Sequence, residues 1–301
     1  MQIIGHHTIR ARLQKQVREK MLSQGYLFYG PESVGKSLCA QEFSYQLVAS
    51  PSFQPSQEQP HPLDVRIIRP DEETKHGVTK KKNISAQTMR EALLFLGSFP
   101  ITGSFRVVIV EEAHTLSHTA QNLLLKTLEE PQSTAVIILV THTIGNIVST
   151  ILSRVEKIRF DYVPAEDIRS GIQELIPSDA VSNIAPFFFS LGRPGMILQA
   201  VHHPEQFTAE RTKLERLFRL SSLSLSQRIA FAEELSKNVP EAIRLFEWWL
   251  PGLHTQALKS TEKRHTVNFF GLLEKIKETL TLLKTTQSNA RLLFEKLFLT
   301  L

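Results

Sequence analysis

The eight residues Gly30–Ser37 (GPESVGKS) constrain the fold of this chain more than any other feature of its sequence. They match the pattern G-x-x-x-x-G-K-[ST] of the phosphate-binding loop (P-loop), in which backbone N–H groups curl around phosphate oxygens. The loop follows a short apolar run at 26–29 and precedes a helical pattern at 38–48, which is the strand–loop–helix setting that the motif requires. The dipole of that helix favours an anion at its N-terminus.

This loop predicts a binding site for the phosphates of ATP. Lys36 would neutralise the β- and γ-phosphates, and the hydroxyl of Ser37 would coordinate Mg²⁺. The predicted ATP-binding residues are Gly30, Pro31, Glu32, Ser33, Val34, Gly35, Lys36 and Ser37.

An acidic pair follows the β-branched run at 107–110, which is typical of a strand buried on both faces. In a P-loop ATPase, acidic residues at the end of such a strand hold Mg²⁺ and orient the attacking water. The sequence therefore predicts Glu111 and Glu112 as catalytic residues, with Glu111 as a second Mg²⁺ ligand.

Strand-like and helix-like segments alternate along the first half of the chain, which predicts βαβ units and an α/β fold with a mainly parallel sheet. The predicted strands are 26–29, 65–68, 107–110, 135–140 and 158–160, and the predicted helices are 8–23, 38–48, 86–97 and 116–128, with a helical turn at 149–152. Ser85 is expected to cap the helix over 86–97. Residues 50–63 and 74–82 are predicted loops. Helical periodicity alone continues after Val163-Pro164, so we predict domain boundaries near 164 and near 207.

The composition is that of an ordinary globular protein, with 301 residues, 42% of them hydrophobic, and a formal net charge of +5. This mildly basic balance is compatible with a polyanionic partner such as nucleic acid. Cys39 is the only cysteine, so we expect no disulfide within the chain and no zinc site. The N-terminus has no apolar region typical of a secretory signal, and no apolar run is long enough to span a bilayer. We therefore expect a soluble, cytoplasmic protein without a membrane partner.

Two further stretches carry a resemblance to a known family. Asn122–Pro131 (NLLLKTLEEP) and Thr150–Arg154 (TILSR), in this order after the P-loop, resemble the δ′ and γ/τ subunits of bacterial DNA polymerase III clamp loaders, which are AAA+ ATPases. Together with the P-loop, the resemblance covers residues 1–160. The spacer from His61 to Gly97 is more similar to δ′ than to γ/τ, and the C-terminal SNARLLFEKLFLTL resembles the last helix of a clamp-loader collar.

The resemblance implies a subunit with three parts. These are an AAA+ RecA-like nucleotide-binding domain over 1–164, a small helical lid over 165–207, and an all-α collar over 208–301 that joins subunits in a ring. The implied partners are other clamp-loader subunits of the γ/τ and δ types, a sliding clamp and primed DNA. The apolar stripe on the C-terminal part would supply contacts between collars, through Leu272, Ile276, Leu280 and Leu283.

The resemblance also assigns roles to two residues outside the P-loop. Arg154 stands at the arginine that acts in trans in this family, as an arginine finger on the ATP of a neighbouring subunit. Thr141 stands at the sensor-1 position, where a hydroxyl can contact the γ-phosphate. The alternative for Thr141 is a threonine that only closes a buried strand.

The chain departs from this family at several positions. Residues 50–63 replace the segment that carries zinc-binding cysteines, Val155 stands at the cysteine of the SRC motif, and Glu111 stands where aspartate is usual. Met196 occupies the position of the sensor-2 arginine, for which Arg193 is the candidate substitute.

These departures favour a δ′-like subunit that binds ATP, hydrolyses it weakly or not at all, and donates Arg154 to a neighbour. A γ/τ-like ATP-hydrolysing motor subunit is the alternative within the family. A P-loop kinase of small molecules is the alternative from another class, although it leaves the TLEEP and ILSR segments unexplained.

Overall fold

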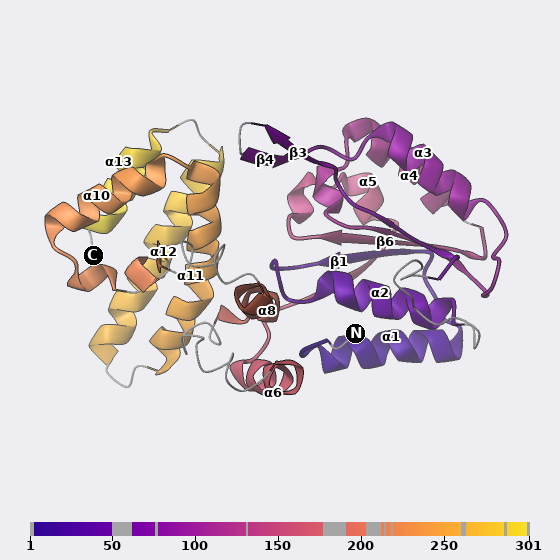
Figure 1. Cartoon of the computed structure of the whole chain (residues 1–301), viewed down its shortest axis with the longest axis horizontal. Helices are drawn as coiled ribbons and strands as arrows, with labels where there is room; N and C mark the ends of the chain where they lie inside the picture. Colours follow the sequence, from indigo (N-terminus) through magenta and orange to yellow (C-terminus); the bar gives the residue numbers. More distant parts are fainter. Residues whose placement is uncertain are drawn as a thin grey trace. The chain divides into compact units, whose positions relative to one another are not determined.

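The computed structural model describes residues 3–49, 62–75, 78–130, 132–176, 191–202, 212–213, 215–217, 219–259, 263–285 and 288–299. The chain divides into two compact units, Met1–Val163 and Pro164–Leu301 (Figure 1). The first unit is built around a β-sheet. The predicted boundary near 207 and all but the last two residues of the predicted loop at 50–63 lie outside the described residues.

The first unit contains a parallel sheet of five strands in the order β2-β5-β6-β1-β7. Its strands are β1 (Gly25–Tyr29), β2 (Val65–Ile68), β5 (Arg106–Val110), β6 (Ala135–Thr141) and β7 (Glu156–Arg159). Every residue of β5 and β6 is buried, as expected for central strands of a parallel sheet that is covered on both faces. The predicted α/β fold with a parallel sheet is therefore confirmed.

Helices cover both faces of this sheet, because successive side chains of a strand point to opposite sides. One face carries α1 (His7–Glu19) and α2 (Lys36–Leu47), and the other carries α3 (Ala86–Leu96), α4 (His118–Glu129) and the short α5 (Ser149–Leu152) (Figure 1). Ile109 lies in one core with Phe43 of α2, whereas Val110 lies in the other core with Leu124 of α4. The continuous apolar run of β5 therefore supplies both cores.

Local capping sets the ends of several helices. Ser85 caps α3 as predicted, since its side chain accepts a hydrogen bond from a backbone N–H of the first turn at 3.1 Å. α4 begins two residues later than predicted because Ser117 is its cap. α1 ends before the predicted residue 23 because Lys20 adopts a left-handed conformation (φ 56°) and closes the last turn.

The predicted loop at 74–82 is wrong for most of its length. Glu72–Lys75 (β3) and Val78–Lys81 (β4) form an antiparallel two-stranded sheet. The threonines and the valine of this segment are β-branched and favour an extended backbone. The backbone register pairs Glu72 with Lys81 and Glu73 with Lys80. The run of lysines suggested a solvated loop and concealed this strand signal.

The second unit is helical in its described residues, which confirms the predicted helical pattern. Its helices are α6 (Ala165–Leu175), α8 (Pro194–His202), α10 (Leu225–Ser236), α11 (Val239–Lys259), α12 (Lys263–Thr285) and α13 (Ala290–Leu299), with a 3₁₀ turn at Leu220–Ser222. α10 packs against α13, and α11 against α12. Phe246 stacks on Phe294 at 5.4 Å, and Phe231 on Phe298 at 5.7 Å. No helix within the described ranges of the chain is both long and apolar enough to cross a membrane.

The apolar stripe on α12 is partly used inside the chain. Ile276 and Leu280 are buried, whereas Leu272 and Leu283 are half-buried. α12 contacts both α11 and α13, so the stripe packs within this unit. The expectation that these residues serve contacts between subunits is therefore wrong for Ile276 and Leu280.

Candidate nucleotide-binding site

The P-loop connects β1 to α2 and has a backbone that few residue types tolerate. Gly30, Ser33 and Gly35 have positive φ angles of 141°, 59° and 104°. At Gly30, a Cβ atom would lie 2.0 Å from the carbonyl oxygen of Phe160, so no side chain fits there. α2 begins at Lys36, directly after Gly35. The loop therefore leads into a helix N-terminus, the feature that favours phosphate binding.

Lys36 is the cationic residue of this loop and is buried. Its Nζ donates hydrogen bonds to the carbonyl oxygen of Gly30 at 2.9 Å and to that of Pro31. The ammonium group is thus held over the loop by the loop's own carbonyls. Charged phosphate oxygens are stronger acceptors than neutral carbonyls, so a bound phosphate can replace these two contacts.

His6 supports the loop from the N-terminal segment, a role for which the sequence contains no signal. Its Nε2 donates to the carbonyl oxygen of Val34 at 2.9 Å, and its ring packs edge-on against Phe160 at 4.8 Å. Burial lowers the pKa of His6 below its ordinary value, against the opposing effect of the hydrogen bond to Val34. The neutral ring with its proton on Nε2 therefore anchors the buried residue Val34.

Glu111 and Glu112 lie directly after β5, but the surroundings of Glu111 differ from those of a metal ligand. Its Oε2 accepts a hydrogen bond from Nε of Arg69 at 2.8 Å, and its Oε1 accepts one from Nε2 of Gln41 at 3.2 Å. Mg²⁺ requires near-ideal octahedral oxygen geometry. A carboxylate with both oxygens hydrogen-bonded to side chains, one of them the cationic Arg69, does not fit that requirement. Ser37, half-buried in the first turn of α2, remains a predicted Mg²⁺ ligand.

Thr141 ends β6, and its buried hydroxyl belongs to a small polar network. Oγ1 lies 3.3 Å from Nδ1 of His114 and accepts a hydrogen bond from the N–H of Thr143 at 3.1 Å. The rings of His114 and His142 meet at 4.0 Å, and Nδ1 of His142 lies 3.3 Å from Oε1 of Glu32. This network joins the P-loop to the segments that follow β5 and β6.

These predicted residues converge because the strands are parallel. Parallel strands end at the same side of the sheet, which we call its carboxyl end, and begin at the other, its amino end. The P-loop follows β1, the acidic pair follows β5, and Thr141 closes β6, so all lie at the carboxyl end. The structure therefore brings Lys36, Glu111, Glu112 and Thr141 to one end of the sheet.

Arg154 lies at the amino end. It precedes β7, which runs parallel to β1, and its carbonyl oxygen is 3.6 Å from the Cβ position of Gly25, where β1 begins. The P-loop starts where β1 ends, and a strand of five residues spans about 16 Å. Nη2 of Arg154 forms an ion pair with Oε1 of Glu129 at 2.7 Å, and Nη1 donates to the carbonyl oxygen of Thr150 at 2.9 Å. The structure thus separates Arg154 from the P-loop of its own chain.

Arg193 and Met196 lie in the second unit, at the start of α8, and both are buried. Nη2 of Arg193 donates to the carbonyl oxygen of Glu247 in α11 at 3.3 Å. Its guanidinium is thus engaged inside the second unit. This contact gives no support to Arg193 as a substitute for the sensor-2 arginine.

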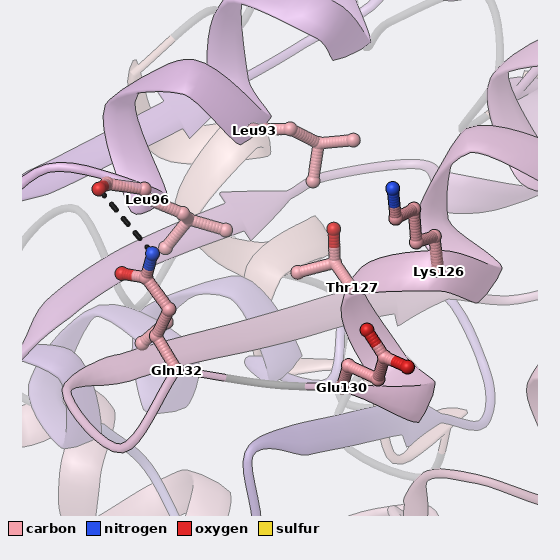
Figure 2. A pocket seen from close by; sticks show the side chains of 8 residues that line it. Leu93, Leu96, Lys126, Thr127, Glu130 and Gln132 are labelled. Carbon is pink, nitrogen blue, oxygen red and sulfur yellow. Dashed lines mark hydrogen bonds between the residues drawn. The ribbon is translucent and has the colours of Figure 1, made fainter.

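A cavity of about 220 Å³ lies between α3 and α4. Figure 2 shows the side chains that line it, among them Leu93, Leu96, Lys126, Thr127, Glu130 and Gln132. Gln132 closes one side by donating to the carbonyl oxygen of Gly97 at 3.4 Å. Ala135 also lines the cavity and is the first residue of β6, so the cavity lies at the amino end of the sheet. It is therefore distinct from the predicted nucleotide site.

Within the described ranges, no three or more histidine, cysteine, aspartate or glutamate side chains are grouped to hold a metal ion. The thiol of Cys39 is buried on α2, and burial raises its pKa to about 12. Cys39 therefore packs as a small apolar residue.

A P-loop motif after the first strand of a parallel sheet in this order is the arrangement of the AAA+ class, a fold consistent with nucleotide binding. Solved structures of Thermotoga maritima RuvB have a similar fold. One of them, a variant with a single substitution, covers 87% of this chain and 91% of its own length, with a TM-score of 0.51 and 15% identity. A second structure, described as a Holliday junction branch migration motor, gives a TM-score of 0.50 at 15% identity. At this identity the likeness shows the fold alone.

The sequence of the first unit identifies the family to which the chain belongs. The family model described as "DNA polymerase III, delta subunit" matches residues 5–164, and the chain belongs to this family. Subunit tau of DNA polymerase III from Bacillus subtilis is 28% identical over 185 residues, which are 59% of this chain and 31% of that protein. Subunit delta′ from Pseudomonas aeruginosa is 29% identical over 143 residues, which are 44% of this chain and 41% of that protein. The chain thus spans less than half the length of these two relatives.

Proposed function

We propose that this chain is a δ′-like clamp-loader subunit that binds ATP at its P-loop and donates Arg154 to the ATP of a neighbouring subunit. The observation that carries the proposal is the separation of Arg154 from the chain's own P-loop by the length of β1. With a P-loop at one end of the sheet and an arginine at the other, each subunit of a ring can complete the site of the next. Membership in the DNA polymerase III delta family supplies the context for such a ring.

The proposed ATP site consists of the P-loop and Thr141. Gly30 and Gly35 allow the loop to close around phosphates, and the N-terminus of α2 adds its dipole. Lys36 would exchange its contacts with loop carbonyls for the β- and γ-phosphates. The hydroxyl of Thr141 would contact the γ-phosphate.

The chain itself is proposed to hydrolyse ATP only weakly, because two side chains that a hydrolysing site would need already bind other groups of the protein. Glu111 holds Arg69 and Gln41, and Arg193 donates to a carbonyl of α11. An arginine finger from a neighbour, worth about 10³–10⁵ in rate, acts only in an assembled ring. A lone chain would therefore turn over ATP very slowly.

The proposed assembly uses all three parts of the chain. Residues 1–164 bind ATP, 165–207 form the lid, and 208–301 form the collar. The proposed partners are γ/τ- and δ-type subunits, a sliding clamp and primed DNA. Three leucines remain more than half exposed on α10 and α13 and can serve contacts between collars: Leu225, Leu292 and Leu299. These exposed residues replace the α12 stripe as the proposed contact surface.

The second candidate is a γ/τ-like motor subunit, which the similarity to tau of Bacillus subtilis supports. The two candidates differ in whether the lone chain hydrolyses ATP. The pairing of the Glu111 carboxylate with Arg69 and Gln41 favours the δ′-like assignment.

The test compares ATP turnover by the purified chain with turnover and clamp loading by a ring rebuilt with partner subunits, clamp and primed DNA. We expect slow turnover alone and loading by the ring only when this chain is present. Turnover near 1 s⁻¹ by the lone chain, about the order of a complete enzyme, would favour the motor subunit. Phosphorylation of a metabolite by the lone chain would favour a small-molecule kinase instead.

A further inference from the structure

An ion pair joins the carboxyl ends of β2 and β5. Arg69 directly follows β2 and Glu111 directly follows β5, and the register of the two strands sets their last residues side by side. Nε of Arg69 lies 2.8 Å from Oε2 of Glu111. The backbone N–H of Glu111 also donates to the carbonyl oxygen of Ile68 at 2.9 Å, which extends the pairing of the strands up to the ion pair.

A second contact holds the other oxygen of the same carboxylate. Gln41 is buried on α2, and its Nε2 donates to Oε1 of Glu111 at 3.2 Å. Gln41 lies four positions after Ser37, so the two side chains project from the same face of α2. Among the described residues, the carboxylate of Glu111 hydrogen-bonds Gln41 and Arg69 and not Ser37. The acidic group is therefore fixed one helical turn away from the predicted Mg²⁺ ligand of the loop.

This arrangement conflicts with a shared metal site. In P-loop NTPases, Mg²⁺ is held by the loop hydroxyl and by an acidic residue at a strand end. The metal demands octahedral oxygen ligands at about 2.0–2.1 Å. Arg69 already compensates the charge of Glu111, and the same positive charge repels a divalent cation.

We propose that Arg69 takes the place of Mg²⁺ as the cation beside Glu111, so that this P-loop binds ATP equally well with and without Mg²⁺. The inference rests on the proposed ATP site. Lys36 and the N-terminus of α2 then balance the phosphate charge, and neither depends on a metal. Glu111 serves as a structural link between β2, β5 and α2.

The experiment is a calorimetric titration of the full chain with ATP, once in excess Mg²⁺ and once in excess EDTA. For the natural chain, the two dissociation constants are expected to agree within about threefold. In Arg69→Ala, Glu111 loses its cation and can accept a metal. We therefore expect this variant to bind ATP about tenfold more tightly in Mg²⁺ than in EDTA.

Arg66→Ala is the matched control, because Arg66 lies on β2, three residues before Arg69, but pairs with Glu91 of α3 at 3.5 Å. Like the natural chain, this variant should bind ATP with about the same dissociation constant in Mg²⁺ and in EDTA. Binding by the natural chain that tightens tenfold or more with Mg²⁺ would overturn the inference and leave the ATP site intact. If Arg69→Ala, with its fold confirmed by circular dichroism, still bound ATP equally well in both buffers, Arg69 would not be the residue that replaces Mg²⁺. Absence of ATP binding in both buffers would overturn the proposed ATP site and the inference together.

Discussion

At the carboxyl end of the sheet, the polar side chains of the candidate site are fixed by contacts inside the protein. Lys36 is 7% exposed and Thr141 1% exposed, and each makes at least two hydrogen bonds. At the amino end, the side chain of Arg154 is 36% exposed, and its ion-pair partner Glu129 is 51% exposed. Lys36 and Arg154, which lie at opposite ends of the sheet, are thus held in different ways.

This difference separates two tasks that one chain can perform in a ring. A ligand is bound most tightly by groups that are already in place, because fewer rotamers are lost on binding. A side chain offered to another subunit has to leave its own contacts, and exposed ion pairs are worth only about 0–1 kcal/mol. This contrast is the one we expect if the carboxyl end binds ATP and the amino end offers Arg154 to another subunit, as proposed.

Arg154→Ala should have the largest effect of any change at the amino end. If Arg154 serves a neighbour's ATP, hydrolysis at that site should fall by about 10³–10⁵, because the transition state loses its charge partner. Arg154→Lys should restore little, since a point charge does not reproduce a planar guanidinium. The measurement is the ATPase rate of a rebuilt ring at saturating ATP, together with the ATP affinity of the lone variant, which should not change.

Arg159→Ala is the control for this prediction. Arg159 closes β7 at the carboxyl end and forms an exposed ion pair with Asp161 at 2.9 Å. Its loss should leave the ring's ATPase unchanged. Equal rates for rings with Arg154→Ala and with the natural chain would remove the finger role.

Lys36→Met should have the largest effect at the carboxyl end. Loss of the charge-assisted contacts to phosphate should weaken ATP binding by about a hundredfold or more. Removal of the hydrogen bonds to the Gly30 and Pro31 carbonyls should cost only about 1 kcal/mol of stability. Calorimetry and urea unfolding measure the two effects. Lys15→Met, on the exposed face of α1, is the matched control and should change neither; unchanged affinity in Lys36→Met would refute the P-loop site.

Asp64 directly precedes β2 and therefore lies at the amino end of the sheet. Asp64→Asn tests whether charged groups at this end contribute little to stability. The buried carboxylate of Asp64 accepts hydrogen bonds from the N–H groups of Ile101, Thr102 and Gly103 at 2.7, 2.7 and 3.0 Å. Asn lacks the charge and places a donor among donors, so the variant should lose about 3 kcal/mol of unfolding free energy. Asp71→Asn, at an exposed position after β2, should lose almost nothing.

The pH dependence of stability provides a second measurement on Asp64. Burial alone would raise the pKa of Asp64, but the three backbone N–H groups outweigh it and hold the pKa below the ordinary value of 3.8. The stabilisation is therefore complete above about pH 3.8 and is lost as the pH falls through the lower pKa of the folded state. Urea unfolding from pH 7 down to well below pH 3.8 should show a larger loss in the natural chain than in Asp64→Asn.

Local patterns were enough to predict the P-loop and the central strands. The loop motif is contiguous, and the β-branched runs at 107–110 and 135–140 carry the signature of strands buried on both faces. The position of Arg154 also follows from strand direction, because a residue that precedes a parallel strand lies at the amino end.

The contacts that decide the chemistry of the site had no such signal. His6 reaches Val34 across 28 positions, and Glu111 meets Arg69 across 42. The second contact depends on the register of β2 against β5, which no local pattern encodes. The sequence therefore predicted which residues stand at the carboxyl end but not which of them are already paired.

Glu129→Gln should have the smallest effect and tests the amino end most directly. The change removes the ion pair with Arg154 but leaves the hydrogen bond from Nη1 of Arg154 to the carbonyl of Thr150. Both side chains are more than a third exposed, so the unfolding free energy should fall by less than about 1 kcal/mol. In a rebuilt ring, Arg154 should reach the neighbour's ATP without first leaving Glu129, so the ATPase rate should stay the same or rise within about threefold. Glu130→Gln, the adjacent exposed carboxylate, is the control and should leave both values unchanged. Two outcomes would contradict this prediction: a loss of stability as large as that expected for Asp64→Asn, or a ring ATPase as slow as with Arg154→Ala. Either would show that Glu129 fixes Arg154 in its working position, so that Arg154 is held as firmly as Lys36.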